Sequence, residues 1–174
     1  VQGRLVEVLS GMKFSDFLRE RLFEPLGMKD TGFQVNEGNM DRLAQLYAPA
    51  GMSGDMNTAF FQQTTMPGLD VAPASASAGF IYGGKFESGG GGLVATARDY
   101  LRFSQMMLNG GELDGVRILS PKTVQLMTTN HIGDLPMGFG RTGAGFGLDF
   151  GVVLDPGAVG EVSSAGEYNW GGAA

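Results

Sequence analysis

A glycine-rich stretch near the end of the printed sequence is the clearest candidate for a substrate site. It reads Trp170-Gly171-Gly172-Ala173 and follows a segment that we expect to be a β-strand. Consecutive glycines on a strand remove side chains, so a ligand can lie against the backbone. An exposed strand edge can then direct N–H groups at a substrate carbonyl, as an oxyanion hole does. The spacing is equally compatible with a glycine bulge beneath a packing tryptophan.

A second pattern, Ser10-Gly11-Met12-Lys13, places a serine and a lysine at the S-x-x-K spacing of a nucleophile pair. That chemistry requires both side chains on consecutive turns of one helix, so that the amine reaches the serine oxygen. Here Ser10 stands at the end of an expected helix, and Gly11 breaks the helix before Lys13. We therefore reject this pair as a nucleophile.

The sequence holds no self-sufficient metal site. His131 is the only histidine and there is no cysteine, which excludes clusters of imidazole or thiolate ligands. We interpret His131 as a surface or helix-capping residue. The four glycines at 89–92 lack the lysine and hydroxyl residue of a phosphate-binding loop, so we interpret them as a turn. No cofactor is predicted.

The composition narrows the classes of function. Twelve basic and 18 acidic side chains give a net charge of −6, and no basic run is present, so nucleic-acid binding is not expected. No apolar run is long enough for a membrane span. With 43% hydrophobic and 17% charged residues, a buried core is expected. The compartment stays open: cytoplasmic, or periplasmic or secreted in a bacterium.

Helical periodicity occurs before and after an aperiodic stretch in the first three quarters of the sequence. Hydroxyl residues suited to N-caps mark the starts of three segments, at Ser15, Thr96 and Ser120. Asp99, three residues after Thr96, completes the form of a capping box. We expect the helix that follows to carry an apolar stripe facing the core, in which two methionines act as core filling. The stripe consists of Tyr100, Leu101, Phe103, Met106, Met107 and Leu108. These signals predict helices over residues 1–10, 15–24, 96–108 and 120–129. Between the last two, Asp114-Gly115 predicts a tight turn before Val116.

The last part of the chain changes to a strand pattern. Apolar residues alternate over 145–153, turn residues follow at 155–157, and 161–170 reads as the returning strand. The sequence therefore predicts an α+β fold. Its expected parts are a helical region, 1–132, and antiparallel strands, 133–174. The helical region contains a long aperiodic loop, 34–88, which is either a site wall or an ordinary surface excursion.

Four stretches, in order, carry a resemblance to a known family. They are the helix pair of 1–33 ending in Thr31-Gly32-Phe33, the segment 91–100, Leu119-Ser120-Pro121-Lys122-Thr123, and the segment 166–172. Together they resemble landmarks of the serine β-lactamase-like and penicillin-binding-protein-type hydrolases. The resemblance is closest to family VIII carboxylesterases and class C β-lactamases, of which this chain looks like a C-terminal part.

The resemblance implies acyl transfer by the serine of an S-x-x-K motif, assisted by its lysine and by the tyrosine of Y-x-N. It implies that the backbone N–H of Ala173 belongs to the oxyanion hole and that Trp170, Gly171 and Gly172 contact the substrate. Many relatives have Lys or His where this chain has Trp170. A lysine can pair with the carboxylate of a β-lactam and a tryptophan cannot, which favours small neutral esters as substrates.

No usable S-x-x-K and no Y-x-N occur in these 174 residues, and the family order places both before Val1. The resemblance thus implies a partner, the missing N-terminal portion of the same enzyme, and an inactive chain without it. A β-lactamase or a D-Ala-D-Ala peptidase-like enzyme is the alternative within the enzymes. From other classes, a non-catalytic relative that binds peptidoglycan or peptides stays open, followed by a complete helical interaction module.

Overall fold

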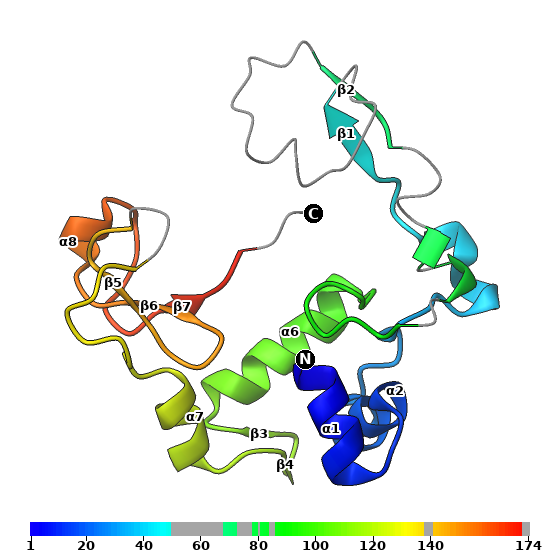
Figure 1. The fold of residues 1–174 in the computed structure, drawn as a ribbon, viewed down its shortest axis with the longest axis horizontal. Coiled ribbons are helices and arrows are strands. Elements are labelled where there is room, and N and C mark those ends of the chain that lie inside the picture. The colour runs from blue at the N-terminus through cyan, green and yellow to red at the C-terminus, as the bar shows by residue number, and fades with distance from the viewer. Residues whose placement is uncertain (50–67, 73–77, 80, 84–85, 138–140, 172–174) are drawn as a thin grey trace. The chain divides into compact units, whose positions relative to one another are not determined.

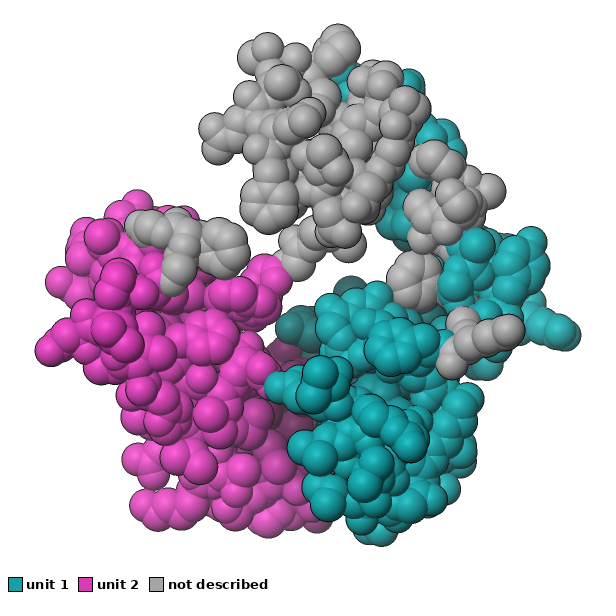
Figure 2. Space-filling model, in the orientation of Figure 1, with its two compact units in different colours: residues 1–102, 173–174 teal, residues 103–172 magenta. Residues whose placement is uncertain are grey.

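The computed structural model describes residues 1–49, 68–72, 78–79, 81–83, 86–137 and 141–171 (Figure 1). They form two compact units, unit 1 within Val1–Arg102 and unit 2 within Phe103–Gly172 (Figure 2). The predicted division at residue 132 separates helices from strands rather than compact units, and it stays a prediction. Gly172 and Ala173 of the predicted substrate motif lie outside the described residues.

Unit 1 begins with the predicted pair of helical segments. α1 (Gln2–Ser10) ends at Gly11, whose φ of 70° directs its N–H to the carbonyl of Glu7. The second segment runs without a break through α2 (Phe14–Leu18), the π-helical η1 (Arg19–Phe23) and α3 (Glu24–Leu26). It ends at Gly27, again in the left-handed region.

The predicted start of the second segment is wrong by two residues. Lys13 has extended dihedrals and occupies the N-cap position, without a side-chain cap. Ser15 lies inside the helix, and its N–H donates to the carboxylate of Glu87 at 2.7 Å. The N–H groups in the first turn of a helix have no partner within the helix. The one of Ser15 is satisfied by a side chain 72 residues further along the chain, a partner that the local sequence cannot reveal.

α1 packs with its small residue inward and its apolar residues outward. A Cβ on Gly3 would lie 3.1 Å from the ring of Phe14, so the glycine permits the close approach of α1 to this buried ring. Leu5, Val8 and Leu9 are between 55% and 78% exposed. The core of unit 1 instead contains Phe14, Phe23, Leu26 and Met28, all buried.

The described parts of the predicted loop 34–88 contain short regular elements. The 3-10 helix η2 (Glu37–Arg42) is followed by β1 (Tyr47–Pro49) and β2 (Leu69–Val71), which pair antiparallel. These pieces span only six and three residues, below the length at which a periodic pattern becomes detectable.

α6 (Ala97–Leu108) begins at the predicted cap, because the Asp99 N–H donates to the Thr96 hydroxyl at 3.2 Å. The Asp99 carboxylate is 4% exposed and accepts hydrogen bonds from the Asp30 N–H (2.7 Å) and the Thr31 hydroxyl (2.8 Å). It therefore ties the helix start to the segment after α3. Met106 and Met107 are buried, as predicted.

Part of the predicted apolar stripe of α6 is wrong. Tyr100, Leu101 and Leu108 were expected to face the core with the two methionines, but they are between 62% and 74% exposed. Consecutive residues point in different directions around a helix. A stripe that contains consecutive residues is therefore wider than one helix face, and only part of it contacts the core.

The first half of unit 2 follows the prediction closely. β3 (Glu112–Leu113) and β4 (Val116–Arg117) form a hairpin whose turn residues, Asp114 and Gly115, have φ of 51° and 80°. α7 (Pro121–Met127) starts at Ser120, whose hydroxyl accepts a hydrogen bond from the Thr123 N–H at 3.0 Å. The helix ends two residues earlier than predicted.

The second half of unit 2 is a three-stranded antiparallel sheet in the order β5 (Ala144–Phe146), β6 (Gly151–Val153), β7 (Tyr168–Asn169). The predicted single strand 145–153 is wrong, because the chain reverses between β5 and β6. Asp149 has a φ of 68°, and a Cβ on Gly147 would lie 2.1 Å from the carbonyl oxygen of Met127. Gly147 thus permits a close backbone approach rather than alternation along a strand.

The predicted turn at 155–157 is instead the start of a short helix, α8 (Pro156–Val159). Asp155 is its N-cap, and its carboxylate accepts hydrogen bonds from the N–H groups of Gly157 and Ala158. The returning strand is antiparallel as predicted, but it is shorter than the expected 161–170. Tyr168 and Asn169 form its ladder pairs with β6, and the Gly166 N–H and the Glu167 carbonyl bond to the backbone of Val153.

Gly111 is a sharp test of backbone packing in unit 2. It has a φ of 95°, and a Cβ there would lie 2.3 Å from the carbonyl oxygen of Leu119. Gly111→Ala should therefore lower the urea midpoint, followed by circular dichroism, well below that of Gly115→Ala. Gly115 has a similar φ of 80° but open space around it, so its replacement costs only the left-handed conformation, about 1–2 kcal/mol. Equal midpoints for the two variants would contradict the close approach.

Candidate active site

The predicted substrate motif starts at the end of β7 in unit 2. Trp170 follows the last paired residue and is 51% exposed. Its ring meets Phe146 edge-on, with centroids 5.0 Å apart and planes at 83°. A Cβ on Gly171 would meet no described atom within 4 Å. Packing among the described residues therefore does not require a glycine here, and the space beside it is open to a ligand.

β7 is an edge strand among the described elements, with β6 as its neighbour. Asn169 is opposite Gly151 and Tyr168 is opposite Val152. The ring of Tyr168 packs edge-on against Phe150, with centroids 5.2 Å apart, and burial raises the pKa of its phenol. Tyr168 thus stays neutral at physiological pH and serves packing. No described strand pairs with the outer side of β7, so its backbone groups there are available to another partner.

The residues that support Phe146 were missed by the sequence analysis. The Phe146 N–H donates to the side-chain oxygen of Asn130 at 3.2 Å, and its carbonyl accepts from the His131 N–H at 2.8 Å. Asn130 also accepts from the Ile132 N–H and donates to the Gly133 carbonyl. A Cβ on Gly145 would lie 2.4 Å from Asn130. The glycine at the start of the predicted strand 145–153 was therefore the sign in the sequence that another group approaches the backbone there.

His131 itself has the role that the sequence predicts. Its side chain is exposed, and the ring Nε2 lies 2.7 Å from the carbonyl oxygen of Leu126 in the last turn of α7. It thus satisfies one of the carbonyls that a helix end leaves without a partner.

The structure also confirms the rejection of Ser10 and Lys13 as a nucleophile pair. Ser10 is the last residue of α1, and its hydroxyl accepts a hydrogen bond from the Met12 N–H at 3.1 Å. Lys13 lies beyond the left-handed Gly11 and forms an ion pair with Glu87 at 2.6 Å. The amine is therefore engaged with a carboxylate and is on another element.

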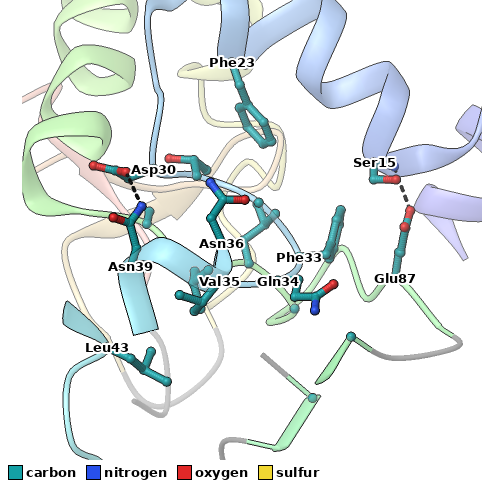
Figure 3. Close-up of a pocket in the computed structure, with 18 of the residues that line it drawn as sticks. Ser15, Phe23, Asp30, Phe33, Gln34, Val35, Asn36, Asn39, Leu43 and Glu87 are labelled. Carbon is teal, nitrogen blue, oxygen red and sulfur yellow. Dashed lines mark hydrogen bonds between the residues drawn. The ribbon is translucent and has the colours of Figure 1, made fainter. Parts of the chain in front are cut away.

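Unit 1 contains a separate cleft of about 1040 Å³ (Figure 3). One wall comes from the segment that follows α3 and includes Phe33, Val35 and Leu43, while Glu87 and the residues before α6 line another side. Both ends of the predicted loop 34–88 therefore contribute to the lining. That this cleft is a wall of the active site stays a prediction.

The charged side chains that line the cleft are all paired. Lys13 contacts Glu87, Arg19 contacts Asp16 at 3.3 Å, and Arg42 contacts Asp30 at 3.1 Å. Asp30 also accepts a hydrogen bond from Asn39 at 3.1 Å. The described part of the lining therefore offers apolar surface and amides, rather than an unpaired charge, to a ligand.

The described part of the chain contains no group of three or more side chains suited to hold a metal ion. In the same residues, no helix combines the length and the apolar character that crossing a bilayer requires.

Comparison with known proteins identifies the family. A family model described as Beta-lactamase matches residues 1–174. The chain therefore belongs to the Beta-lactamase family, in agreement with the resemblance that the four sequence stretches indicate.

Two curated relatives align with nearly the whole chain. Protein Rv1367c of Mycobacterium tuberculosis is 34% identical over 185 residues, which cover 99% of this chain and 41% of the relative. Penicillin-binding protein 4 of Amycolatopsis lactamdurans is 32% identical over 175 residues, covering 98% of this chain and 40% of the relative. The chain thus spans about two fifths of the length of these relatives.

Among solved structures, the hydrolase EstCE1, described as having promiscuous acyltransferase activity, superposes with a TM-score of 0.70. It is 22% identical, and the match covers 94% of this chain and 41% of EstCE1. This likeness shows a shared fold, and the α+β class predicted from the sequence is confirmed.

Glu87 should make the stability of the chain sensitive to acid. Burial acts to raise the pKa of Glu87, but hydrogen bonds from Lys13 and Ser15 outweigh it, so the pKa lies below the ordinary 4.5. A carboxylate whose pKa is lowered by folding stabilises the fold above the unfolded pKa and loses that contribution as pH falls below it. Urea midpoints should therefore fall between pH 5 and pH 3 more steeply for the unchanged chain than for Glu87→Gln. Parallel pH profiles would contradict this.

Asn130 should be the side chain on which the β5 backbone depends. Asn130→Ala removes the acceptor of the Phe146 N–H, and we expect the free energy of unfolding to fall by about 1–3 kcal/mol. Asn109→Ala is the matched control, because Asn109 accepts from Gln105 in an exposed pair, and such a surface pair contributes little. Equal effects in urea denaturation would show that Asn130 is not such a support.

Proposed function

We propose that this chain is part of a serine hydrolase that works through an acyl-serine intermediate and acts on small neutral esters. The observation that carries the proposal is the half-exposed Trp170 at the end of edge strand β7, beside Gly171 in open space. Family membership and the order of the four sequence stretches support the reaction class.

In this mechanism a serine oxygen attacks the ester carbonyl, and negative charge develops on the carbonyl oxygen. The backbone N–H of Ala173 donates a hydrogen bond to that oxygen, which stabilises the transition state. The alcohol leaves with a proton, and water then attacks the acyl-enzyme to release the acid. The serine, its lysine and the tyrosine belong to a part of the polypeptide outside these 174 residues, and this part is the proposed partner of the chain.

The preference for neutral substrates follows from the chemistry of Trp170. An indole offers a flat apolar surface and one N–H donor, and it has no charge to pair with a substrate carboxylate. EstCE1, which has the same fold, is a hydrolase with promiscuous acyltransferase activity, and this supports an ester as the proposed substrate. The similarity to Penicillin-binding protein 4 favours, as the alternative, a β-lactamase or D-Ala-D-Ala peptidase-like enzyme.

A non-catalytic relative that binds peptidoglycan or peptides is the candidate from another class. The motivating observation is that these 174 residues contain no usable S-x-x-K and no Y-x-N. An intact serine, lysine and tyrosine in the parent protein would decide for the enzyme.

The deciding experiment compares two substrates with the full-length parent protein. We expect hydrolysis of p-nitrophenyl butyrate at a kcat/KM at least tenfold above that for a chromogenic cephalosporin. Trp170→Lys should lower the ester rate and improve the cephalosporin rate, because a lysine can pair with the cephalosporin carboxylate. A parent that hydrolyses the cephalosporin preferentially is a β-lactamase. One that hydrolyses neither contradicts the esterase, and release of D-alanine from a D-Ala-D-Ala peptide then distinguishes a peptidase from a binding protein.

The 174-residue chain alone should be inactive, since an oxyanion donor without a nucleophile has no acyl-enzyme to stabilise. Purified chain and heat-treated chain should therefore release p-nitrophenol at the same rate. Turnover above the heat-treated control would place the nucleophile within these residues.

A further inference from the structure

The contact between Phe146 and Trp170 joins the two outer strands of a three-stranded sheet. Phe146 on β5 is opposite Gly151 on β6, and Gly151 is opposite Asn169, the residue before Trp170. The ring centroids of Phe146 and Trp170 are 5.0 Å apart. A Cβ on Gly151 would lie 2.9 Å from the side chain of Met137, so the space beside the middle strand is filled by that methionine. The aromatic pair thus connects the first strand of the sheet to the residue that follows the third.

The two members of this pair differ in how firmly they are held. Phe146 has its N–H bonded to Asn130, its carbonyl bonded to His131 and a place in the β5–β6 register. Trp170 lies just beyond the paired residues of β7 and is 51% exposed. The edge-to-face contact with Phe146 at 83° is the geometry that aromatic rings prefer. A fixed ring therefore orients a ring on a less constrained backbone.

We propose that Phe146 is a positioning residue, which holds the Trp170 indole so that its exposed surface forms a platform for the neutral, apolar part of a substrate. The face of an indole carries a negative quadrupole, which favours neutral or cationic groups over carboxylates. The use of this platform in catalysis rests on the proposed function. Binding of a neutral ligand to the platform does not.

Trp170 is the only tryptophan in the chain, so its fluorescence reports on this platform alone. The 174-residue chain is titrated with cyclohexyl acetate and, separately, with cyclohexanecarboxylate, with excitation at 295 nm. We expect a saturable change of emission with the neutral ester and a weaker response with the anion of similar shape. An absent response to the ester, or an emission spectrum already equal to that in 6 M guanidinium, overturns the proposal.

Variants separate positioning from general packing. Phe146→Leu should move the Trp170 emission to longer wavelength and weaken cyclohexyl acetate binding roughly three- to tenfold, the range expected for loss of one aromatic pair. Phe146→Tyr keeps the ring and should restore both. Phe150→Leu is the matched control, because it removes an aromatic pair of the same sheet, with Tyr168, that does not include Trp170.

The control fixes the outcomes. Phe146→Leu and Phe150→Leu should lower the guanidinium midpoint by similar amounts. If the Trp170 emission and the affinity for cyclohexyl acetate then change in Phe146→Leu alone, Phe146 is a positioning residue. Equal losses of affinity in both variants, or unchanged affinity in Phe146→Leu, overturn it.

Phe146→Leu in the full-length parent should raise the KM for p-nitrophenyl butyrate and leave kcat unchanged. A parent without esterase activity refutes the proposed function, and the fluorescence result then decides the platform independently.

Discussion

Unit 2 depends on the close approach between the end of α7 and the β5 strand. Gly145 and Gly147 have no side chains, and this lets Asn130 and the Met127 carbonyl come within distances that a Cβ would forbid. Asn130 and His131 then hold the backbone of Phe146 from both sides. The place of the Phe146 backbone thus depends on two glycines, Gly145 and Gly147, that leave room for its supports.

Unit 1 is organised by carboxylates that satisfy backbone donors far away in the sequence. Asp99 accepts hydrogen bonds from Asp30 and Thr31, and Glu87 accepts one from the N–H of Ser15. Both acids are nearly buried, so their partners are necessary to offset the loss of hydration. These contacts bring the two ends of the long segment 34–88 to one cleft.

Local signals in the sequence predicted elements whose causes are local. Gly11 as a helix end, Thr96 and Ser120 as caps, and the turn at Asp114 each act within a few residues. Predictions failed where a distant group decides the structure. Ser15 bonds Glu87 instead of capping a helix, and the alternation over 145–153 reflects glycines facing Asn130 and Met127. The candidate site, Trp170 and its glycines, is visible in the sequence and stays a prediction. The residues that contact its described part are not visible there, because Asn130 and Phe146 belong to no short pattern.

The outward face of α1 has a consequence for the behaviour of the molecule in solution. Leu5, Val8 and Leu9 form an apolar stripe on a helix whose inner face is a glycine. Such a stripe favours contact between molecules, while the net charge of −6 opposes it. Added salt screens that repulsion and leaves the apolar attraction intact. We therefore expect the colloidal stability of the chain to fall as the ionic strength of the buffer rises.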